Sequence, residues 1–198
     1  MVAKRLVVFA SGSGSNFEAL VRQVPREVAE VALLVCDQPG AYCLERAAAL
    51  GVPTFVAERA AYPSKAEFEW AIASRLAEAR PDLIALAGYM RIIGPGLLGA
   101  YPGQIVNIHP SLLPAFPGRT AIADALAFGV KVTGVTVHFV DAGIDTGPII
   151  AQAAIRIDDG EALPDLTARI HKLEHQLYPE VVTQLLGVPR RVSNADKF

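Results

Sequence analysis

Short, nearly continuous apolar segments recur along the first half of the chain and alternate with segments of helical periodicity. Such apolar runs are typical of strands that helices cover on both faces of a sheet. The predicted strands are Leu6–Ala10, Val31–Cys36, Thr54–Val56 and Leu83–Ala87. The predicted helices between them are Phe17–Val24, Cys43–Leu50 and Lys65–Ala79. This alternation predicts an α/β fold with an open, mostly parallel twisted sheet, Rossmann-like, with right-handed crossovers.

After about residue 100 the pattern becomes more varied. Gly134–Val140 alternates apolar and polar residues, as an antiparallel or edge strand does. The periodicity of Leu163–Leu186 predicts one long terminal helix. The remaining predicted elements are two strands and a short helix, Gln104–Ile108, Pro148–Ile157 and Thr120–Phe128. The sequence thus predicts a single domain over residues 1–189, with an altered C-terminal half, and a polar tail at 190–198.

The composition of the 198 residues is that of an ordinary globular protein, with 52% hydrophobic and 19% charged residues. The net charge of −2 gives no general attraction for nucleic acid or anionic lipid, so we expect small-molecule partners. No segment approaches the ~18 consecutive apolar residues of a membrane-spanning helix, and the apolar start is too short for a signal peptide. We therefore expect a cytoplasmic protein without membrane contact. Cys36 and Cys43 match neither a metal-ligand spacing nor a disulfide framework.

Polar and glycine-rich clusters follow four of the predicted strands. They are Ser11–Asn16, Gly88–Ile93, Asn107–Ser111 and Asp141–Gly147. In open α/β sheets, ligands bind outside the carboxyl ends of the strands, at the point where the connections change direction. We therefore expect the four clusters to line a single cleft.

The glycine-rich turn at Ser11–Asn16 leaves three interpretations open. Exposed amides at a helix N-terminus bind phosphate, and Ser15 and Asn16 can add side-chain donors. Alternatively, the turn only joins a strand to a helix that one of these two residues caps. A dinucleotide site would use Asp37 as the ribose-binding acid, but Phe17 stands where its third glycine is needed. No Lys-Ser or Lys-Thr follows the glycines, which excludes an ATP-binding P-loop.

The segment around Asn107 and His109 has the residue types that acyl-transfer chemistry needs. Alternate residues of a strand share a face, so both side chains should point toward the cleft. An amide and a protonated imidazole together stabilise a developing oxyanion. If Asp145 faces His109, its charge favours the imidazolium form. The alternatives are a histidine that only packs against a turn, and an aspartate in an ordinary surface loop.

No other constellation in the sequence suggests a reacting centre. His171 and His175 lie one helical turn apart, but they form no zinc motif, so we expect solvated or capping histidines and no metal. The serines of the glycine-rich turn lack the Gly-x-Ser-x-Gly frame of a nucleophile.

Four motifs occur in one order along the chain: Ser-Gly-Ser-Gly-Ser-Asn at 11–16, Leu-Ala-Gly-Tyr-Met-Arg-Ile-Ile at 86–93, Asn-Ile-His-Pro-Ser-Leu-Leu-Pro at 107–114 and Val-His-Phe-Val…Asp-Thr-Gly-Pro-Ile-Ile at 137–150. With these motifs the chain resembles the folate-dependent formyltransferases, and the serine-glycine turn narrows the resemblance to the branch that acts on glycinamide ribonucleotide. The resemblance implies transfer of the formyl group of 10-formyltetrahydrofolate, a co-substrate, to the amine of N1-(5-phosphoribosyl)glycinamide in purine biosynthesis.

The resemblance also implies residue roles. Asn107 and His109 would stabilise the oxyanion, while Asp145 would keep His109 cationic and relay the amine proton. The residues implied for the ribonucleotide are Gly14, Ser15, Asn16, Pro110, His171, Lys172, Leu173 and Glu174. Those implied for the folate are Lys65, Met90, Arg91, Ile92, Ile93, Asn107, Asp141, Ala142, Gly143, Ile144 and Asp145. No metal is implied, and Arg119 has no assigned role.

Three other functions remain as alternatives. A 10-formyltetrahydrofolate hydrolase or another folate-dependent formyltransferase would be expected to carry a further domain, for which 198 residues leave little room. A nucleotide-dependent oxidoreductase would use Asp37 but would leave Asn107, His109 and Asp145 without a role. A binding domain without catalysis is the third alternative. The sequence leaves open whether the protein is a monomer or a homodimer.

Overall fold

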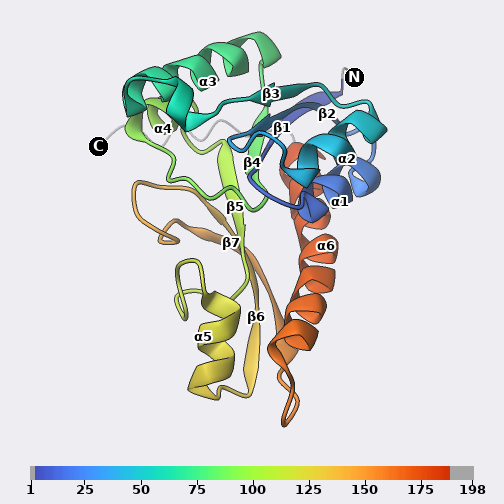
Figure 1. Ribbon diagram of the computed structural model, residues 1–198. Helices are drawn as coiled ribbons and strands as arrows, with labels where there is room; N and C mark the ends of the chain where they lie inside the picture. Colours follow the sequence, from blue (N-terminus) through green and yellow to red (C-terminus); the bar gives the residue numbers. More distant parts are fainter. Residues whose placement is uncertain (1–2, 188–198) are drawn as a thin grey trace, which may run out of the picture.

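The computed structural model describes residues 3–187, which form seven strands, six α-helices and one short 3₁₀ helix (Figure 1). The strands are β1 (Lys4–Ala10), β2 (Ala29–Cys36), β3 (Thr54–Val56), β4 (Leu83–Leu86), β5 (Ile105–His109), β6 (Val132–Phe139) and β7 (Ile149–Arg156). The helices are α1 (Ser15–Gln23), α2 (Tyr42–Leu50), η1 (Arg59–Ala61), α3 (Lys65–Ala79), α4 (Pro95–Ala100), α5 (Ala121–Phe128) and α6 (Leu163–Gly187). The predicted tail at 190–198, and with it the end of the predicted domain, lies outside the described residues.

The strands form one sheet in the order β3-β2-β1-β4-β5-β6-β7. The first five strands in this order are parallel, whereas β6 pairs antiparallel with β5 and with β7. The predicted fold class is therefore confirmed. Of the two positions considered for the Gly134–Val140 strand, the antiparallel one is correct, because β6 lies inside the sheet and not at its edge.

Each face of the sheet has its own hydrophobic core, and β1 contributes to both. Leu6 and Val8 pack on one face with residues of α1, α2 and α6. Val7 and Phe9 pack on the other face with residues of α3 and α4. Both faces are covered, which explains why β1 is apolar without interruption.

Two elements were not predicted, α4 and η1. The six residues of α4 include two glycines and a proline at the helix start, so its sequence shows no clear helical period. Leu97 of α4 is nevertheless buried in the same core as α3. Tertiary contact, and not intrinsic propensity, stabilises this short helix.

The topology produces a change of direction between β1 and β4. After β1, strands β2 and β3 lie on one side of β1 in the sheet. The chain then crosses to the other side, where β4 and β5 lie. The turns that follow β1 and β4 therefore lie side by side at the carboxyl edge of the sheet, where ligands bind in folds of this type.

Candidate active site

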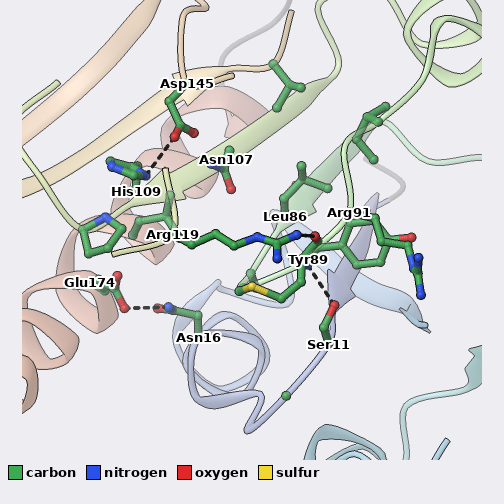
Figure 2. A pocket seen from close by; sticks show the side chains of 18 of the residues that line it. Ser11, Asn16, Leu86, Tyr89, Arg91, Asn107, His109, Arg119, Asp145 and Glu174 are labelled. Atoms are coloured by element: carbon green, nitrogen blue, oxygen red, sulfur yellow. Dashed lines mark hydrogen bonds and ion pairs between the residues drawn. The ribbon is translucent and has the colours of Figure 1, made fainter. Parts of the chain in front are cut away.

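A cavity of about 590 Å³ lies at this edge, and all four polar clusters contribute to it (Figure 2). The expectation of a single cleft is thus confirmed. The predicted site residues that line it are Gly14, Ser15, Asn16, Met90, Arg91, Ile92, Ile93, Asn107, His109, Pro110, Asp141, Gly143, Ile144, Asp145, His171 and Glu174.

Four predicted site residues do not line the cavity: Lys65, Ala142, Lys172 and Leu173. Lys65 begins α3, and its exposed ammonium group lies 3.5 Å from the Glu69 carboxylate. Lys172 is exposed on α6, between two residues of the same helix, His171 and Glu174, that do line the cavity.

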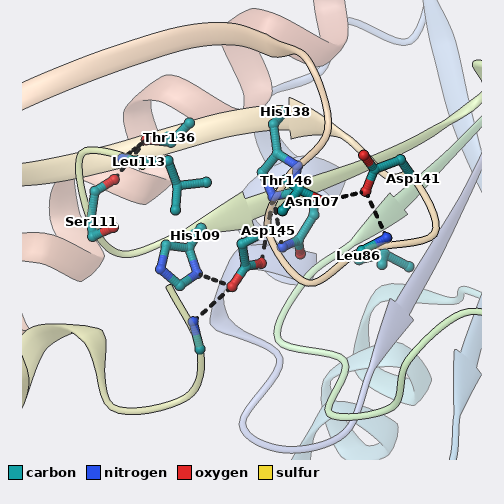
Figure 3. A network of polar contacts seen from close by, with 12 residues as sticks. Leu86, Asn107, His109, Ser111, Leu113, Thr136, His138, Asp141, Asp145 and Thr146 are labelled. Atoms are coloured by element: carbon teal, nitrogen blue, oxygen red, sulfur yellow. Dashed lines mark hydrogen bonds and ion pairs between the residues drawn. The ribbon is translucent and has the colours of Figure 1, made fainter. Parts of the chain in front are cut away.

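His109 ends β5 and is almost completely buried, with 4% of its surface exposed. Its Nε2 lies 2.9 Å from the carbonyl oxygen of Phe116. A carbonyl oxygen only accepts hydrogen bonds, so Nε2 carries a proton. Its Nδ1 lies 3.4 Å from Oδ2 of Asp145 (Figure 3). A second proton, on Nδ1, would form an imidazolium facing a carboxylate.

Asp145 is held in the ionised form by the groups around it. Its contact with His138 is the largest cause that lowers the pKa of the Asp145 carboxyl. The Gly118 amide, which donates to Oδ2 at 2.8 Å, and the charge of His109 also lower this pKa, whereas burial opposes them. The carboxylate therefore remains charged well below neutral pH.

Both protein groups that His109 faces come from residues with unusual backbone angles. Asp145 and Phe116 have φ values of 55° and 52°, in the left-handed region that side chains other than glycine rarely adopt. Such conformations cost free energy and gather at functional sites, where the surrounding structure holds them.

Hydrogen bonds and close contacts of its own residues determine the conformation of the loop that carries Asp145. Oδ1 of Asp141 accepts hydrogen bonds from the amide of Gly143 and the hydroxyl of Thr146. A side chain at Gly147 would collide with a backbone carbonyl of β6, and one at Gly143 would collide with Thr146. The two glycines are thus needed for the tight turn that returns Asp145 to the cavity.

His138 is a site residue that the sequence prediction missed. It lies on β6 directly opposite Asn107 of β5 and is 2% exposed. Its Nδ1 lies 2.8 Å from the carbonyl oxygen of Phe139 and therefore carries a proton. In the neutral ring, Nε2 accepts from Nδ2 of Asn107 at 3.2 Å. Nε2 also lies 3.7 Å from Oδ1 of Asp145, and in the doubly protonated ring it is a donor directed to this carboxylate (Figure 3).

Asn107 keeps hydrogen-bonding capacity for a ligand. An amide nitrogen has two N–H groups, and His138 takes one of them. Asn107 and His109 lie on the same face of β5, as the strand period predicts. The contact between Asp145 and His109, which the sequence left open, is present in the structure.

On the α6 side of the cavity, Asn16 and Glu174 form a buried pair. Nδ2 of Asn16 donates to Oε2 of Glu174 at 2.8 Å, and the residues are 8% and 5% exposed. Burial raises the pKa of the Glu174 carboxyl, although the bond from Asn16 and the charge of His171 oppose this. Within residues 3–187, no hydrogen-bond partner is found for Oδ1 of Asn16.

The turn before α1 requires glycine at position 14. Gly14 has a φ of 72°, and a Cβ there would lie 2.5 Å from Cβ of Cys43. This close approach lets α1 begin at Ser15, directly at the cavity. The first amides of a helix have no partners within it and favour an anion.

The Gly88–Ile93 turn gives the cavity an apolar rim. Met90 and Ile92 are 51% and 59% exposed, and Ile144 of the 141–147 loop is 58% exposed. The guanidinium group of Arg91 points away from the cavity (Figure 2) and lies 5.6 Å from the Phe68 ring.

The structure also bears on the metal and dinucleotide alternatives. Within residues 3–187 no group of His, Cys, Asp or Glu side chains could hold a metal ion, and no helix is long and apolar enough to cross a membrane. Cys36 and Cys43 are buried free thiols. The Asp37 carboxylate, which a dinucleotide site would use for ribose, is already bonded to Ser11 and Arg91.

Comparison with known proteins agrees with this geometry. Residues 4–182 match the formyl transferase family, so the chain belongs to that family. The chain is 56% identical to phosphoribosylglycinamide formyltransferase of Bacillus subtilis over 194 residues, 97% of this chain and 100% of that protein. It is 44% identical over 181 residues to the Mycobacterium tuberculosis H37Rv protein of the same name, covering 91% of this chain and 84% of that one.

A solved structure shows the same fold. The crystal structure of glycinamide ribonucleotide transformylase 1 from Geobacillus kaustophilus is 59% identical to this chain and superposes with a TM-score of 0.90. The match covers 93% of this chain and 100% of that one.

Proposed function

We propose that this protein transfers the formyl group of 10-formyltetrahydrofolate to the amine of N1-(5-phosphoribosyl)glycinamide, a step of purine biosynthesis. The names of the relatives support the reaction and the acceptor. The observation that carries the proposal is the composition of the cavity. It combines Asn107, His109 and Asp145 on one wall with a helix N-terminus and the Asn16–Glu174 pair on another.

The reaction is a direct attack of the substrate amine on the formyl carbon. The carbon–nitrogen bond forms while the carbonyl electrons move to oxygen, which gives a tetrahedral oxyanion. The free N–H of Asn107 and the positive charge of His109 stabilise this oxyanion. Donors of this kind are worth ~10²–10³ in rate when the site is formed in advance.

Asp145 has two functions in this mechanism. Its carboxylate, 3.4 Å from Nδ1 of His109, stabilises the imidazolium form. Through a water molecule it also takes the proton that the attacking nitrogen must lose and passes it to N10 of the folate. The oxyanion then reforms its carbonyl, the bond to N10 breaks and tetrahydrofolate leaves. No covalent enzyme intermediate is needed.

The ribonucleotide occupies the side of the cavity formed by α1 and α6. Its phosphate lies at the Gly14–Asn16 turn, where the first amides of α1 and the Ser15 hydroxyl donate to it. Glu174 accepts hydrogen bonds from the glycinamide end, which gives the buried carboxylate a second partner. Pro110 and His171 complete this side of the cavity, and Lys172 and Leu173, which do not line it, follow His171 on α6.

The folate occupies the side between the Gly88–Ile93 turn and the 141–145 loop. Backbone groups of Met90–Ile93 and of Asp141–Asp145 hold the pterin, and the exposed apolar side chains of these turns cover it. Lys65 meets a carboxylate of the folate tail beyond the cavity, where its exposed ammonium group exchanges its contact with Glu69 for the ligand.

One assay tests the whole proposal. Purified protein is mixed with glycinamide ribonucleotide and 10-formyl-dideazafolate, and the release of the deformylated folate is followed by absorbance. Release that requires the ribonucleotide is the expected result. Equal release without ribonucleotide would identify a hydrolase, and no release by folded protein would mean that the acceptor is a different amine.

A further inference from the structure

Asp37, the residue that follows β2, is a buried carboxylate that lies next to the cavity without lining it. Its residue surface is 2% exposed. Oδ1 accepts a hydrogen bond from the Ser11 hydroxyl at 2.5 Å, and Oδ2 accepts one from Nε of Arg91 at 2.6 Å. The side-chain amide of Gln38 also donates to Oδ2, at 3.1 Å. The carboxylate thus joins the strand ends of β1 and β4.

The direction of the Ser11 hydrogen bonds is fixed by its neighbours. The amide of Met90 donates to the Ser11 oxygen at 2.9 Å (Figure 2). The hydroxyl proton is therefore directed to Asp37. The backbone amide of Ser11 donates in turn to the carbonyl oxygen of Gly88 at 3.2 Å. The chain after β1 is therefore bonded at two points to the chain after β4.

These two turns belong to different substrates in the proposed function. Ser11 begins the turn that leads to Gly14 and α1, on the ribonucleotide side. Met90 and Arg91 belong to the turn on the folate side. We propose that Asp37 is a positioning residue that holds both turns in one arrangement, so that each substrate, by stabilising its own turn, favours binding of the other. This inference rests on the proposed function for the identity of the two ligands.

The position requires a carboxylate and not merely a side chain of that size. An asparagine presents one oxygen and one NH₂ group, whereas both partners of Asp37, the Ser11 hydroxyl and the Arg91 guanidinium, donate toward it. In one orientation the asparagine NH₂ group donates to the Ser11 oxygen and the Ser11 proton loses its acceptor, and in the other the NH₂ group faces the Arg91 guanidinium. In both orientations the charge opposite Arg91 is lost. Asp37→Asn therefore changes the volume little and weakens the connection between the two turns.

The test compares Asp37→Asn with a matched control, Asp82→Asn. Asp82 is also a carboxylate bonded to a strand, through Lys4 and the amide of Arg5, but it precedes β4 at the opposite edge of the sheet. We expect Asp37→Asn to raise the KM for glycinamide ribonucleotide and the KM for 10-formyl-dideazafolate by about tenfold each, with kcat within about threefold of wild type. Asp82→Asn should leave both KM values unchanged.

Two further measurements separate positioning from a general loss of stability. Calorimetric titration of the ribonucleotide, with and without the folate analogue, measures the factor by which one ligand strengthens the other. This factor should exceed one in wild type and fall to one in Asp37→Asn. Amide exchange in the ligand-free protein should become faster in residues 11–16 and 88–93 of the variant.

A change in only one KM, or a coupling factor that survives in Asp37→Asn, would overturn the proposal. If Asp37→Asn does not fold, Ser11→Ala provides the same test, since it removes the hydroxyl that joins Asp37 to the Met90 amide. Failure of the proposed function would be visible separately, as wild-type protein without ribonucleotide-dependent turnover. The amide-exchange measurement needs neither substrate. It therefore still tests whether Asp37 holds the two turns together if the proposed function is wrong.

Discussion

The strands from β1 to β4 and the strands β5 and β6 contribute to the cavity in different ways. The first part, β1 to β4, supplies turns whose backbone groups line the cavity, and the side chains at its rim are exposed, as at Met90 and Ile92. The part from β5 to the loop after β6 supplies ionisable side chains that are almost completely buried, as at His109 and His138. In the proposed function, the first part chiefly holds the substrates, and the second part performs the chemistry and also contacts the folate through the 141–145 loop.

Two of the three carboxylates that line the cavity, Asp145 and Glu174, also contrast with each other. The surroundings lower the pKa of Asp145 and raise the pKa of Glu174. Hydrogen bonds and positive charge dominate at Asp145, whereas burial dominates at Glu174. Carboxylates with opposite shifts in one site serve different roles. We expect the Asp145 carboxylate to stay ionised throughout the reaction. We expect the Glu174 carboxylate to accept a hydrogen bond from the substrate.

The largest expected effect comes from removing the charge in the catalytic part. Asp145→Asn should lower kcat by ~10³-fold, because the imidazolium of His109 loses its support and the proton relay is interrupted. Both KM values should change little. Steady-state kinetics measure this, with Asp159→Asn, which changes an exposed carboxylate paired with Lys131, as the control. Wild-type kcat/KM in Asp145→Asn would remove Asp145 from the mechanism.

The effect of Asp145→Asn on the free energy of unfolding should depend on pH, because the Asp145 carboxyl titrates in the wild type. Since the folded-state pKa of Asp145 lies below its ordinary value of 3.8, its charge stabilises the folded state above that pH. The stabilisation is lost as the pH falls through the folded-state pKa. The difference in unfolding free energy between wild type and Asp145→Asn should be constant from about pH 5 to 8 and shrink below about pH 4. A difference that grows on acidification would contradict the direction of this shift.

A smaller effect is expected at His138, which holds Asn107 and contacts Asp145. His138→Ala should lower kcat by about 10–100-fold with nearly unchanged KM values, because Asn107 loses its fixed orientation. His175→Ala is a suitable control, since that histidine lies on α6 outside the cavity lining. An increase in KM without a change in kcat would place His138 in substrate binding instead.

In the binding part, Ser15→Ala should act on one KM only. Loss of a hydrogen bond to phosphate should raise the KM for the ribonucleotide by about tenfold and leave the KM for the folate unchanged. Steady-state titration of each substrate at saturation with the other provides both values. Equal increases in both would contradict the assignment of the Gly14–Asn16 turn to the phosphate.

The smallest effect is one of stability. A raised folded-state pKa means that Glu174 destabilises the folded protein as the pH rises above the ordinary glutamate value of 4.5. Glu174→Gln keeps an acceptor for Asn16 and removes the buried charge, so Tm at pH 7 should rise by about 2–4 °C. The gain should vanish near pH 4, where both states are protonated. Calorimetry of the ligand-free protein tests this, and a lower Tm at pH 7 would refute it.

Local sequence patterns were sufficient to predict the sheet, most helices and the shared face of Asn107 and His109, whereas the role of Asp145 beside them came only from the family resemblance. They succeed because buried parallel strands are continuously apolar and because alternate strand residues share a face. His138 was missed because its place opposite Asn107 depends on the register of β5 and β6, which no local pattern records. Likewise, the sequence does not show that the side chain of Arg91 turns away from the cavity to meet Asp37.

Single-turnover formyl transfer in His109→Ala most directly tests the claim that one part of the cavity binds the substrates and another performs the chemistry. The variant is mixed with saturating glycinamide ribonucleotide and 10-formyl-dideazafolate, and the Kd of each ligand is measured in parallel by calorimetry. We expect both Kd values within about threefold of wild type and a transfer rate lower by at least ~10²-fold. A wild-type rate would contradict the account, as would a slower rate caused entirely by weaker binding.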